Sequence, residues 1–341
     1  MHPEMTAGNE RGSSGAHVLF ATWLGELFDG MDASIYVLVL FPALSELLKT
    51  TDHSQVGVVG SYVLAIFMVG WAVGAMVFGC LADYIGRAKT MMITILLYAI
   101  CTGLCAISQT WQELAFYRFL VGCGIGGEIS IGAVMLSEFF KGRSRLHAVA
   151  FLSTSFGCGY LIAAVLNLLL GGLGWRWLFL AGVAPALVTV YIRAKIKEPE
   201  QFIKVQQIKK VSSGKGRSHF GDVAGFTFLK LFNPENRGKV LVVIGLASTA
   251  IIGYWAVLSW IPAWVNQLTG TNAIAERSQT AITMNIGAIL AAAFGGVLIE
   301  RLGRANAFRF AFAGGLISCV SMFLSVKAFG PMLLGWVFFV G

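Results

Sequence analysis

Apolar runs about as long as a bilayer is thick recur along the whole of this 341-residue chain. An α-helix rises about 1.5 Å per residue, so roughly 20 apolar residues cross a hydrocarbon core of ~30 Å. Only 12% of the residues are charged, against about 25% in an ordinary soluble domain. The sequence therefore predicts an all-α integral membrane protein and excludes a soluble enzyme. We predict nine full spans, at 18–42, 56–82, 91–109, 112–137, 148–170, 176–193, 239–265, 279–299 and 306–326, and a shorter segment at 331–341.

The basic residues between the predicted spans fall mainly on one side of the membrane. With the N-terminus in the cytoplasm, that side carries the 194–238 stretch and Arg87, Lys89, Lys141, Arg143, Arg145, Arg301, Arg304 and Arg309. The opposite loops keep Lys49, Arg176, Arg277 and Lys327. This asymmetry satisfies the positive-inside rule and predicts a cytoplasmic N-terminus and 194–238 loop. The net charge of +8 thus reflects membrane topology, and we expect no nucleic-acid partner.

One long hydrophilic segment divides the chain. We predict a six-helix transmembrane bundle at 1–193, a basic cytoplasmic loop at 194–238, and a partial second bundle at 239–341. Within the loop, apolar residues at three-residue spacing favour a short amphipathic helix on the membrane face, and a solvated linker is the alternative. If the second half also has six spans, the chain contains about nine or ten of twelve, which is the pattern of a fragment.

A short motif occurs once in each half. Gly79-x-x-x-Asp83-x-x-Gly86-Arg87 follows the second predicted span, and Gly296-x-x-x-Glu300-x-x-Gly303-Arg304 follows the eighth. Such an internal repeat is typical of transporters built from two related halves. The glycines would allow close helix contact and a tight turn, and the acidic and basic side chains could form a latch whose contacts exist in one conformation only. The alternative is an ordinary turn whose charges only set topology.

These residues resemble the major facilitator superfamily, whose signature loop reads Gly-x-x-x-Asp-x-x-Gly-Arg-x-Lys and here ends at Lys89. A second match is the fourth span, where Arg118 heads a glycine-rich stretch from Gly122 to Gly127, and Glu138 closes the span. The resemblance implies a two-bundle transporter that is monomeric, resides in a bacterial inner membrane, and uses Glu138 in the latch.

The first span contains Asp29-Gly30-Met31-Asp32, which resembles the aromatic-acid and sialate proton symporters of the superfamily and overlaps its sugar transporters. This resemblance favours proton-coupled symport of an organic acid or sugar. An uncoupled facilitator and a non-transporting membrane sensor are the alternatives. A carboxyl group in a low-dielectric cavity binds a proton more readily than one in water, so the proton-coupling candidates are Asp29, Asp32 and Glu128.

An ionisable side chain inside a membrane span is a functional candidate, because burying its charge is costly. Arg118 could receive the carboxylate of an anionic solute, could couple protonation to conformational change, or could pair structurally with one of the acids. Trp255 and Asn285 are candidate solute contacts, whereas Trp264 fits the aromatic belt at a membrane interface. We expect no metal or cofactor, because all six cysteines lie in apolar runs without metal-ligand spacing.

Overall fold

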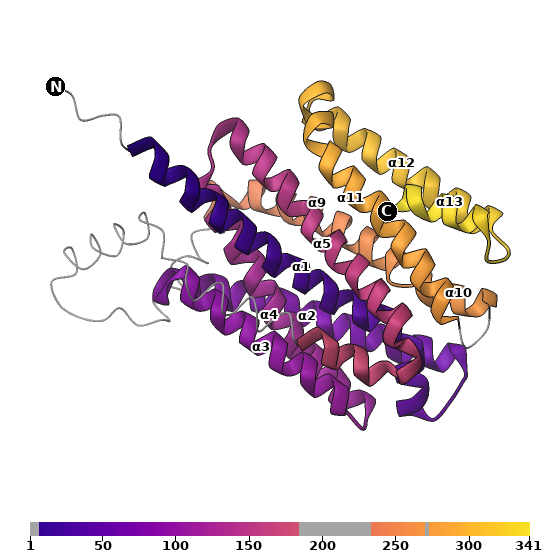
Figure 1. Ribbon diagram of the computed structural model, residues 1–341. Coiled ribbons are helices and arrows are strands. Elements are labelled where there is room, and N and C mark those ends of the chain that lie inside the picture. The colour runs from indigo at the N-terminus through magenta and orange to yellow at the C-terminus, as the bar shows by residue number, and fades with distance from the viewer. Residues whose placement is uncertain (1–6, 184–232, 270–272) are drawn as a thin grey trace, which may run out of the picture.

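The computed structural model describes residues 7–183, 233–269 and 273–341, and these parts of the chain are almost entirely helical (Figure 1). The helices of the N-terminal half are α1 (Ala7–Leu48), α2 (His53–Ile85), α3 (Arg87–Ile107), α4 (Trp111–Phe139) and α5 (Gly142–Leu170). A single 3₁₀ turn, η1 (Gly171–Leu173), follows α5, and residues 175–183 are again helical. The later helices are α9 (Arg237–Leu258), α10 (Ile261–Thr269), α11 (Ile274–Leu302), α12 (Arg304–Ser325) and α13 (Pro331–Val340).

Eight helical segments in the described ranges are long and apolar enough to cross a membrane. They correspond to eight of the nine predicted spans, and α13 corresponds to the shorter predicted segment at 331–341. The sixth predicted span, 176–193, begins in helix 175–183 and otherwise lies outside the described residues, as does most of the 194–238 loop. The predicted all-α membrane fold is confirmed.

Local sequence signals explain where several helices begin. Asp52 precedes α2, and its carboxylate accepts a hydrogen bond from the Ser54 amide at 2.9 Å. Thr110 precedes α4 in the same way, with its hydroxyl oxygen 3.2 Å from the Glu113 amide. Both residues satisfy amide groups that the first turn of a helix leaves without a carbonyl partner.

The repeated motif forms the same turn in both halves. Gly86 lies between α2 and α3 with φ +109° and ψ 152°, and Gly303 lies between α11 and α12 with φ +76° and ψ 156°. At each position the glycine amide donates back to a carbonyl of the helix before, and the glycine carbonyl accepts from the helix after. Positive φ is strained for residues with a Cβ atom. Glycine therefore occurs at this position of both motifs because the turn requires positive φ.

Glycine also brings α2 and α4 into direct backbone contact. A Cβ atom added at Gly74 would lie 1.9 Å from the Cys123 carbonyl oxygen, and one added at Gly126 would lie 2.0 Å from that of Trp71. Only residues without a side chain fit at these two positions. Small residues at such crossings are how membrane helices pack closely where no aqueous hydrophobic effect drives them together. This packing places the Arg118 segment of α4 against α2.

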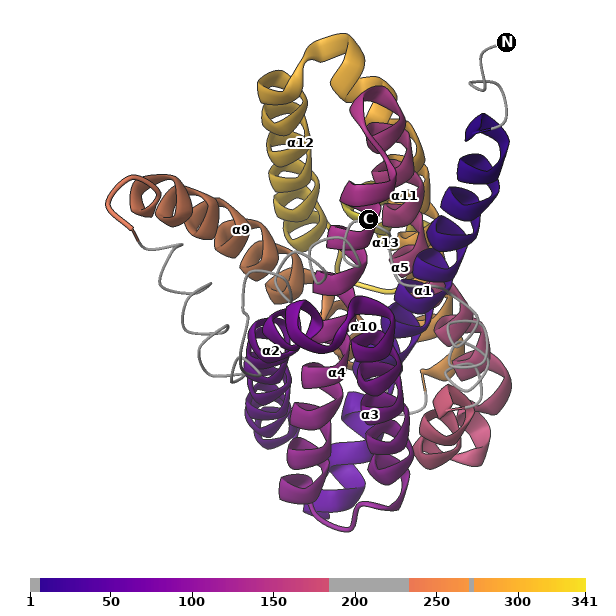
Figure 2. The ribbon, with the colours of Figure 1, turned by 90° about the vertical axis from the view of Figure 1, so that its left-hand side faces the viewer.

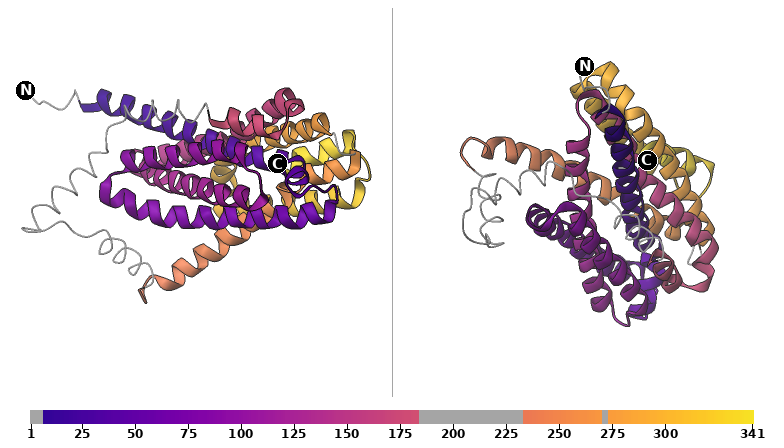
Figure 3. Two further views of the ribbon diagram at one scale, coloured as in Figure 1. Left: turned by 90° about the horizontal axis from the view of Figure 1, so that it is seen from below. Right: turned by 60° about the vertical axis from the view of Figure 1, so that its left-hand side comes forward.

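The two halves meet mainly where α5 packs along α11 (Figure 1). The Asn167 amide on α5 donates to the Ser278 hydroxyl on α11 at 2.9 Å, and both side chains are buried. Figure 3 shows α11, α12 and α13 side by side, next to the bundle of α1 to α5. In Figure 2, α9 extends away from the rest of the molecule, and most of its large apolar side chains are exposed. Exposed apolar faces of this extent suit contact with lipid.

The connections of the helices define two ends of the molecule. We call the end that carries the α1–α2 and α3–α4 connections, the C-terminus of α10 and the N-terminus of α11 the distal end. The proximal end carries Gly86, the α4–α5 connection and Gly303. The predicted cytoplasmic side corresponds to the proximal end.

Three sequence expectations need correction. The first helix runs from Ala7 to Leu48, well beyond the predicted 18–42, and continues through Pro42. The span predicted at 239–265 is found at Arg237–Thr269, but its helix is interrupted at Ser259 and Trp260 and so divides into α9 and α10, with Pro262 in the first turn of α10. Proline lacks an amide proton and fits a first helical turn, which accounts for a restart there. Arg277, expected in a loop, is a buried residue of α11 and only 4% exposed.

Candidate functional site

A buried ion pair joins two of the predicted candidates in the N-terminal half. Arg118 Nη1 on α4 lies 2.7 Å from Asp32 Oδ2 on α1, and the two side chains are 0% and 1% exposed. The other carboxylate oxygen, Asp32 Oδ1, accepts a hydrogen bond from the Thr102 hydroxyl of α3 at 2.5 Å. Three helices therefore converge on one carboxylate. A buried charge of this kind is tolerated because it is paired and hydrogen-bonded.

Two aromatic rings lie against the guanidinium group. The Arg118 Cζ atom lies 4.4 Å from the Phe67 ring centroid and 5.0 Å from that of Tyr36, which are cation–π distances. Arg118 Nε and Nη2 are buried and have no hydrogen-bond partner among the described residues. One edge of the guanidinium thus binds Asp32, and the edge formed by Nε and Nη2 remains available to an acceptor.

A cluster of aromatic side chains lies beside this pair and connects the two halves. Phe67 and Trp71 of α2 both contact Trp255 of α9 edge to face, with ring centroids 6.3 Å and 5.9 Å apart. Trp71 also contacts Phe156 of α5 at 6.3 Å, and Phe156 contacts Tyr160 at 5.4 Å. Trp255 lies in the last turn of α9, which ends at Leu258. The flat apolar faces of the cluster and the adjacent cation could together bind a planar anion.

The other predicted solute and proton candidates are buried as well. Asp29 on α1 and Glu128 on α4 are 0% and 1% exposed. Asn285 on α11 is buried, and its amide nitrogen donates to the Ala281 carbonyl of its own helix at 2.7 Å. The structure thus brings Asp32 and Arg118 into contact and places Trp255 in the aromatic cluster. Roles for Asp29, Glu128 and Asn285 stay predictions.

The latch residues of the first motif lie at the proximal end. Asp83 Oδ1 near the end of α2 and Arg87 Nη2 at the start of α3 are 4.0 Å apart across the Gly86 turn, and the Asp83 side chain is 45% exposed. Lys89 is exposed. Gly79 was expected to allow close helix contact, but an added Cβ atom would meet no neighbour within 4 Å. In this conformation the glycine that the turn requires is Gly86.

The latch residues of the second motif make a contact between the halves. Glu300 Oε1 on α11 lies 3.9 Å from His147 Nε2 on α5. A Cβ atom added at Gly296 would lie 3.5 Å from the Ala150 Cβ, which is ordinary contact. The side chains of Glu138 and Arg304 lie outside the described residues. The latch as a whole therefore stays a prediction.

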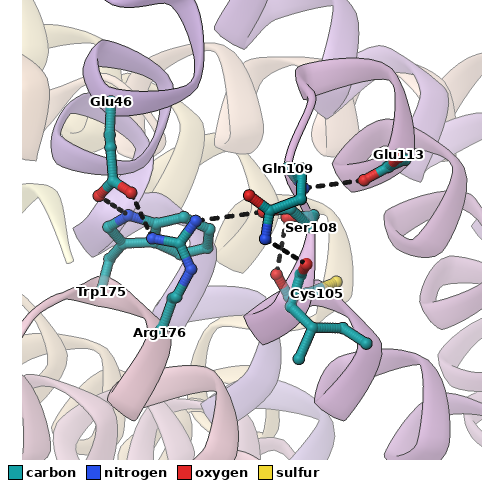
Figure 4. A network of polar contacts seen from close by, with 8 residues as sticks. Glu46, Cys105, Ser108, Gln109, Glu113, Trp175 and Arg176 are labelled. Carbon is teal, nitrogen blue, oxygen red and sulfur yellow. Dashed lines mark hydrogen bonds and ion pairs between the residues drawn. The ribbon is translucent and has the colours of Figure 1, made fainter.

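A polar network ties three helices together at the distal end (Figure 4). Glu46 of α1 accepts hydrogen bonds from the Trp175 indole at 2.8 Å and from the Arg176 guanidinium. Arg176 also donates to the Ser108 carbonyl at the end of α3 at 3.2 Å, and its guanidinium lies 4.2 Å from the Trp175 ring centroid. Arg176, expected simply as a loop charge, thus fixes the distal ends of α1, α3 and the helix at 175–183.

Sequence reasoning missed four residues of the site: Tyr36, Phe67, Trp71 and Thr102. A threonine in an apolar span carries no signal of its own, because it commonly bonds to its own helix. Phe67 and Trp71, in contrast, did carry a signal in the sequence. They lie in the middle of α2, far from the interfacial belt that accounts for most tryptophans in membrane spans.

Known proteins share this architecture. The xylose transporter XylE from E. coli, solved in a partially occluded inward-open conformation, aligns with a TM-score of 0.72. The alignment covers 96% of this chain and 83% of XylE, and the sequences are 16% identical, so the likeness concerns the fold.

Three relatives match along most of the chain and about three quarters of their own lengths. A Haemophilus influenzae protein named for metabolite transport is 32% identical and covers 92% of this chain and 74% of itself. The sialic acid transporter NanX of Escherichia coli is 27% identical, with coverages of 94% and 75%. The cis,cis-muconate transport protein of Acinetobacter baylyi is 26% identical, with coverages of 95% and 76%.

A family profile described as Major Facilitator Superfamily matches residues 22–341. The chain therefore belongs to the major facilitator superfamily of membrane transporters.

Proposed function

We propose that this protein is a proton-coupled symporter of small planar organic acids in the bacterial inner membrane, with its proximal end in the cytoplasm. The observation that carries the proposal is the buried guanidinium of Arg118. One of its edges is paired with Asp32, the other is without a partner among the described residues, and the Phe67 and Tyr36 rings lie against it. The names of the relatives support the solute class, because cis,cis-muconate and sialic acid are both carboxylates.

The unoccupied edge of Arg118 suits a carboxylate. The Nε and Nη2 groups of a guanidinium donate two parallel hydrogen bonds, and the two oxygens of a carboxylate accept them in the same plane. A lysine ammonium group does not present two parallel donors in one plane. A solute whose carboxylate binds here would place its flat body near the Phe67, Trp71 and Trp255 rings. Aromatic or conjugated acids fit this surface better than flexible, fully hydrated ones.

Charge balance explains why a proton would accompany the solute. The Arg118–Asp32 pair carries one buried positive and one buried negative charge. An organic anion alone would leave an excess negative charge, which is costly in a low-dielectric interior. If Asp32 is protonated as the anion binds, the solute carboxylate compensates the charge of Arg118 in place of the Asp32 carboxylate. The summed charge of Arg118, Asp32 and the solute then stays zero. The Asp32 carboxylate is thus the proton carrier, and Thr102 holds it in place in the deprotonated state.

Both halves contribute to this site, as alternating access requires. Asp32, Thr102, Arg118 and Phe67 belong to the N-terminal half, whereas Trp255 belongs to the C-terminal half. A relative movement of the halves would separate Trp255 from the α2 rings and open one path to the site. The uncoupled facilitator is the competing function. It predicts that neutralising Asp32 leaves transport in every assay unchanged.

Uptake of labelled benzoate and cis,cis-muconate into proteoliposomes tests the proposal. We expect an inward proton gradient to drive accumulation by the wild type. Asp32→Asn should abolish accumulation and retain exchange of labelled for unlabelled acid. Arg118→Lys should lower binding at least tenfold. The matched control is Asp52→Asn, because Asp52 is exposed and asparagine also caps a helix. Full gradient-driven accumulation by Asp32→Asn would refute the proposed coupling.

A further inference from the structure

A cavity of about 180 Å³ lies at the distal end, between the two halves. Phe41 of α1 and His53 of α2 line it from the N-terminal half. Trp260, just before α10, and Ala263, Trp264 and Gln267 of α10 line it from the C-terminal half. None of its lining residues belongs to the Arg118 site. The cavity is therefore a separate place where a molecule could contact both halves.

The walls of the cavity are flat rings on both sides. The Phe41 and His53 rings stack with centroids 4.3 Å apart and planes 23° apart. On the opposite wall, Trp260, Ala263, Trp264 and Gln267 follow the i, i+3, i+4, i+7 spacing and so share one face of the helix. The Trp264 ring is fixed from behind by Phe323 of α12, 5.0 Å away. This packing gives the indole a role beyond the membrane belt predicted from the sequence.

The polar side chains of the cavity favour an anion. The lining contains one imidazole, His53, and one carboxamide, Gln267, and it contains no acidic residue. An imidazole N–H and a carboxamide N–H both donate hydrogen bonds, and both suit a carboxylate oxygen. The nearest acidic neighbour in sequence, Asp52, is exposed, and its carboxylate caps the first turn of α2. A carboxylate in the cavity would thus meet donors without a competing acid in the lining.

The volume limits the size of the ligand. An apolar protein cavity of roughly 150 Å³ holds a benzene molecule, whereas sites for drug-sized ligands begin at about 300 Å³. A cavity of about 180 Å³ therefore matches one six-membered ring with a carboxylate group. We propose that the distal cavity is a second binding site for a single-ring organic acid, held between the wall of Phe41 and His53 and the wall of Trp260, Trp264 and Gln267, with His53 and Gln267 as its hydrogen-bond donors. This proposal rests on the solute class of the proposed function.

Equilibrium binding of radiolabelled benzoate to the purified protein tests the second site. We expect two classes of site in the wild type. In the double variant His53→Phe/Gln267→Leu, which keeps the ring stack and the bulk but removes both donors, one class should weaken at least tenfold. Arg118→Met should remove the other class. Gln55→Leu is the matched control, because Gln55 is exposed on α2 and does not line the cavity.

The outcomes separate the two proposals. A double variant with the wild-type binding curve would overturn the distal site and would indicate that the cavity holds lipid or water. Loss of one class in the double variant together with no effect of Arg118→Met would support the distal site and overturn the Arg118 site. Absence of benzoate binding in the wild type would overturn both. Helical circular dichroism and gel-filtration profiles equal to wild type show that each variant is folded.

Discussion

The charges of Arg118 and Asp32 stabilise the fold only as a pair. Their closest atoms are 2.7 Å apart, and both side chains are almost fully buried. Removing one partner of such a pair costs about 3–5 kcal/mol, because the other charge stays buried and uncompensated. We therefore expect Asp32→Asn, which keeps the shape and leaves Arg118 charged, to lower the free energy of unfolding by about 3–5 kcal/mol. Arg118→Met should lower it by a similar amount.

The double variant Asp32→Asn/Arg118→Met gives the decisive comparison. It contains no buried charge at these two positions, and replacing a buried ion pair by neutral groups is often close to neutral in stability. We expect it to recover most of the loss, so that its destabilisation is far smaller than the sum of the two single losses of about 3–5 kcal/mol each. The assay is reversible unfolding in mixed micelles, followed by tryptophan fluorescence. Additive destabilisation in the double variant would show that the two charges do not compensate each other.

Three further predictions follow from the packing and the turns. Gly126→Ala should cost about 1–3 kcal/mol in unfolding experiments, because its Cβ would overlap the Trp71 carbonyl, whereas Gly79→Ala, with open space around it, should be tolerated. Gly303→Ala should cost about 1–2 kcal/mol in a thermal melt because of its positive φ, and a stability equal to wild type would contradict the turn geometry. Thr102→Val removes a hydrogen bond to Asp32 and keeps the side-chain volume. Gradient-driven uptake of benzoate into proteoliposomes should therefore fall several-fold, and uptake equal to wild type would contradict a part for Thr102 in the site.

The sequence predicts the membrane helices well because their signal is strong and local. Span length, loop charge and the repeated motif are each readable without tertiary information. The turns at Gly86 and Gly303 show why the repeat exists, since both glycines adopt positive φ. The break after α9 was missed because a uniformly apolar segment gives no periodicity that marks an interruption. Pro262 was the only local signal for it.

The site was predicted only in part, because its members come from distant parts of the chain. Asp32 and Arg118 were identified as separate candidates, since each is an ionisable group in an apolar span. Their pairing across 86 positions depends on how α1 and α4 cross, which a single sequence does not specify. The contribution of Thr102 depends on the same crossing. Arg277 was placed in a loop because the start of α11 is polar in sequence but buried in the fold.

The central claim is that Arg118 exchanges the Asp32 carboxylate for that of the solute while Asp32 takes up a proton. Titration calorimetry of benzoate binding in two buffers with different ionisation enthalpies measures this proton directly. We predict that the wild type takes up a proton for each acid bound at the Arg118 site, and that Asp32→Asn binds the acid without proton uptake. The same proton uptake in both proteins would contradict the account.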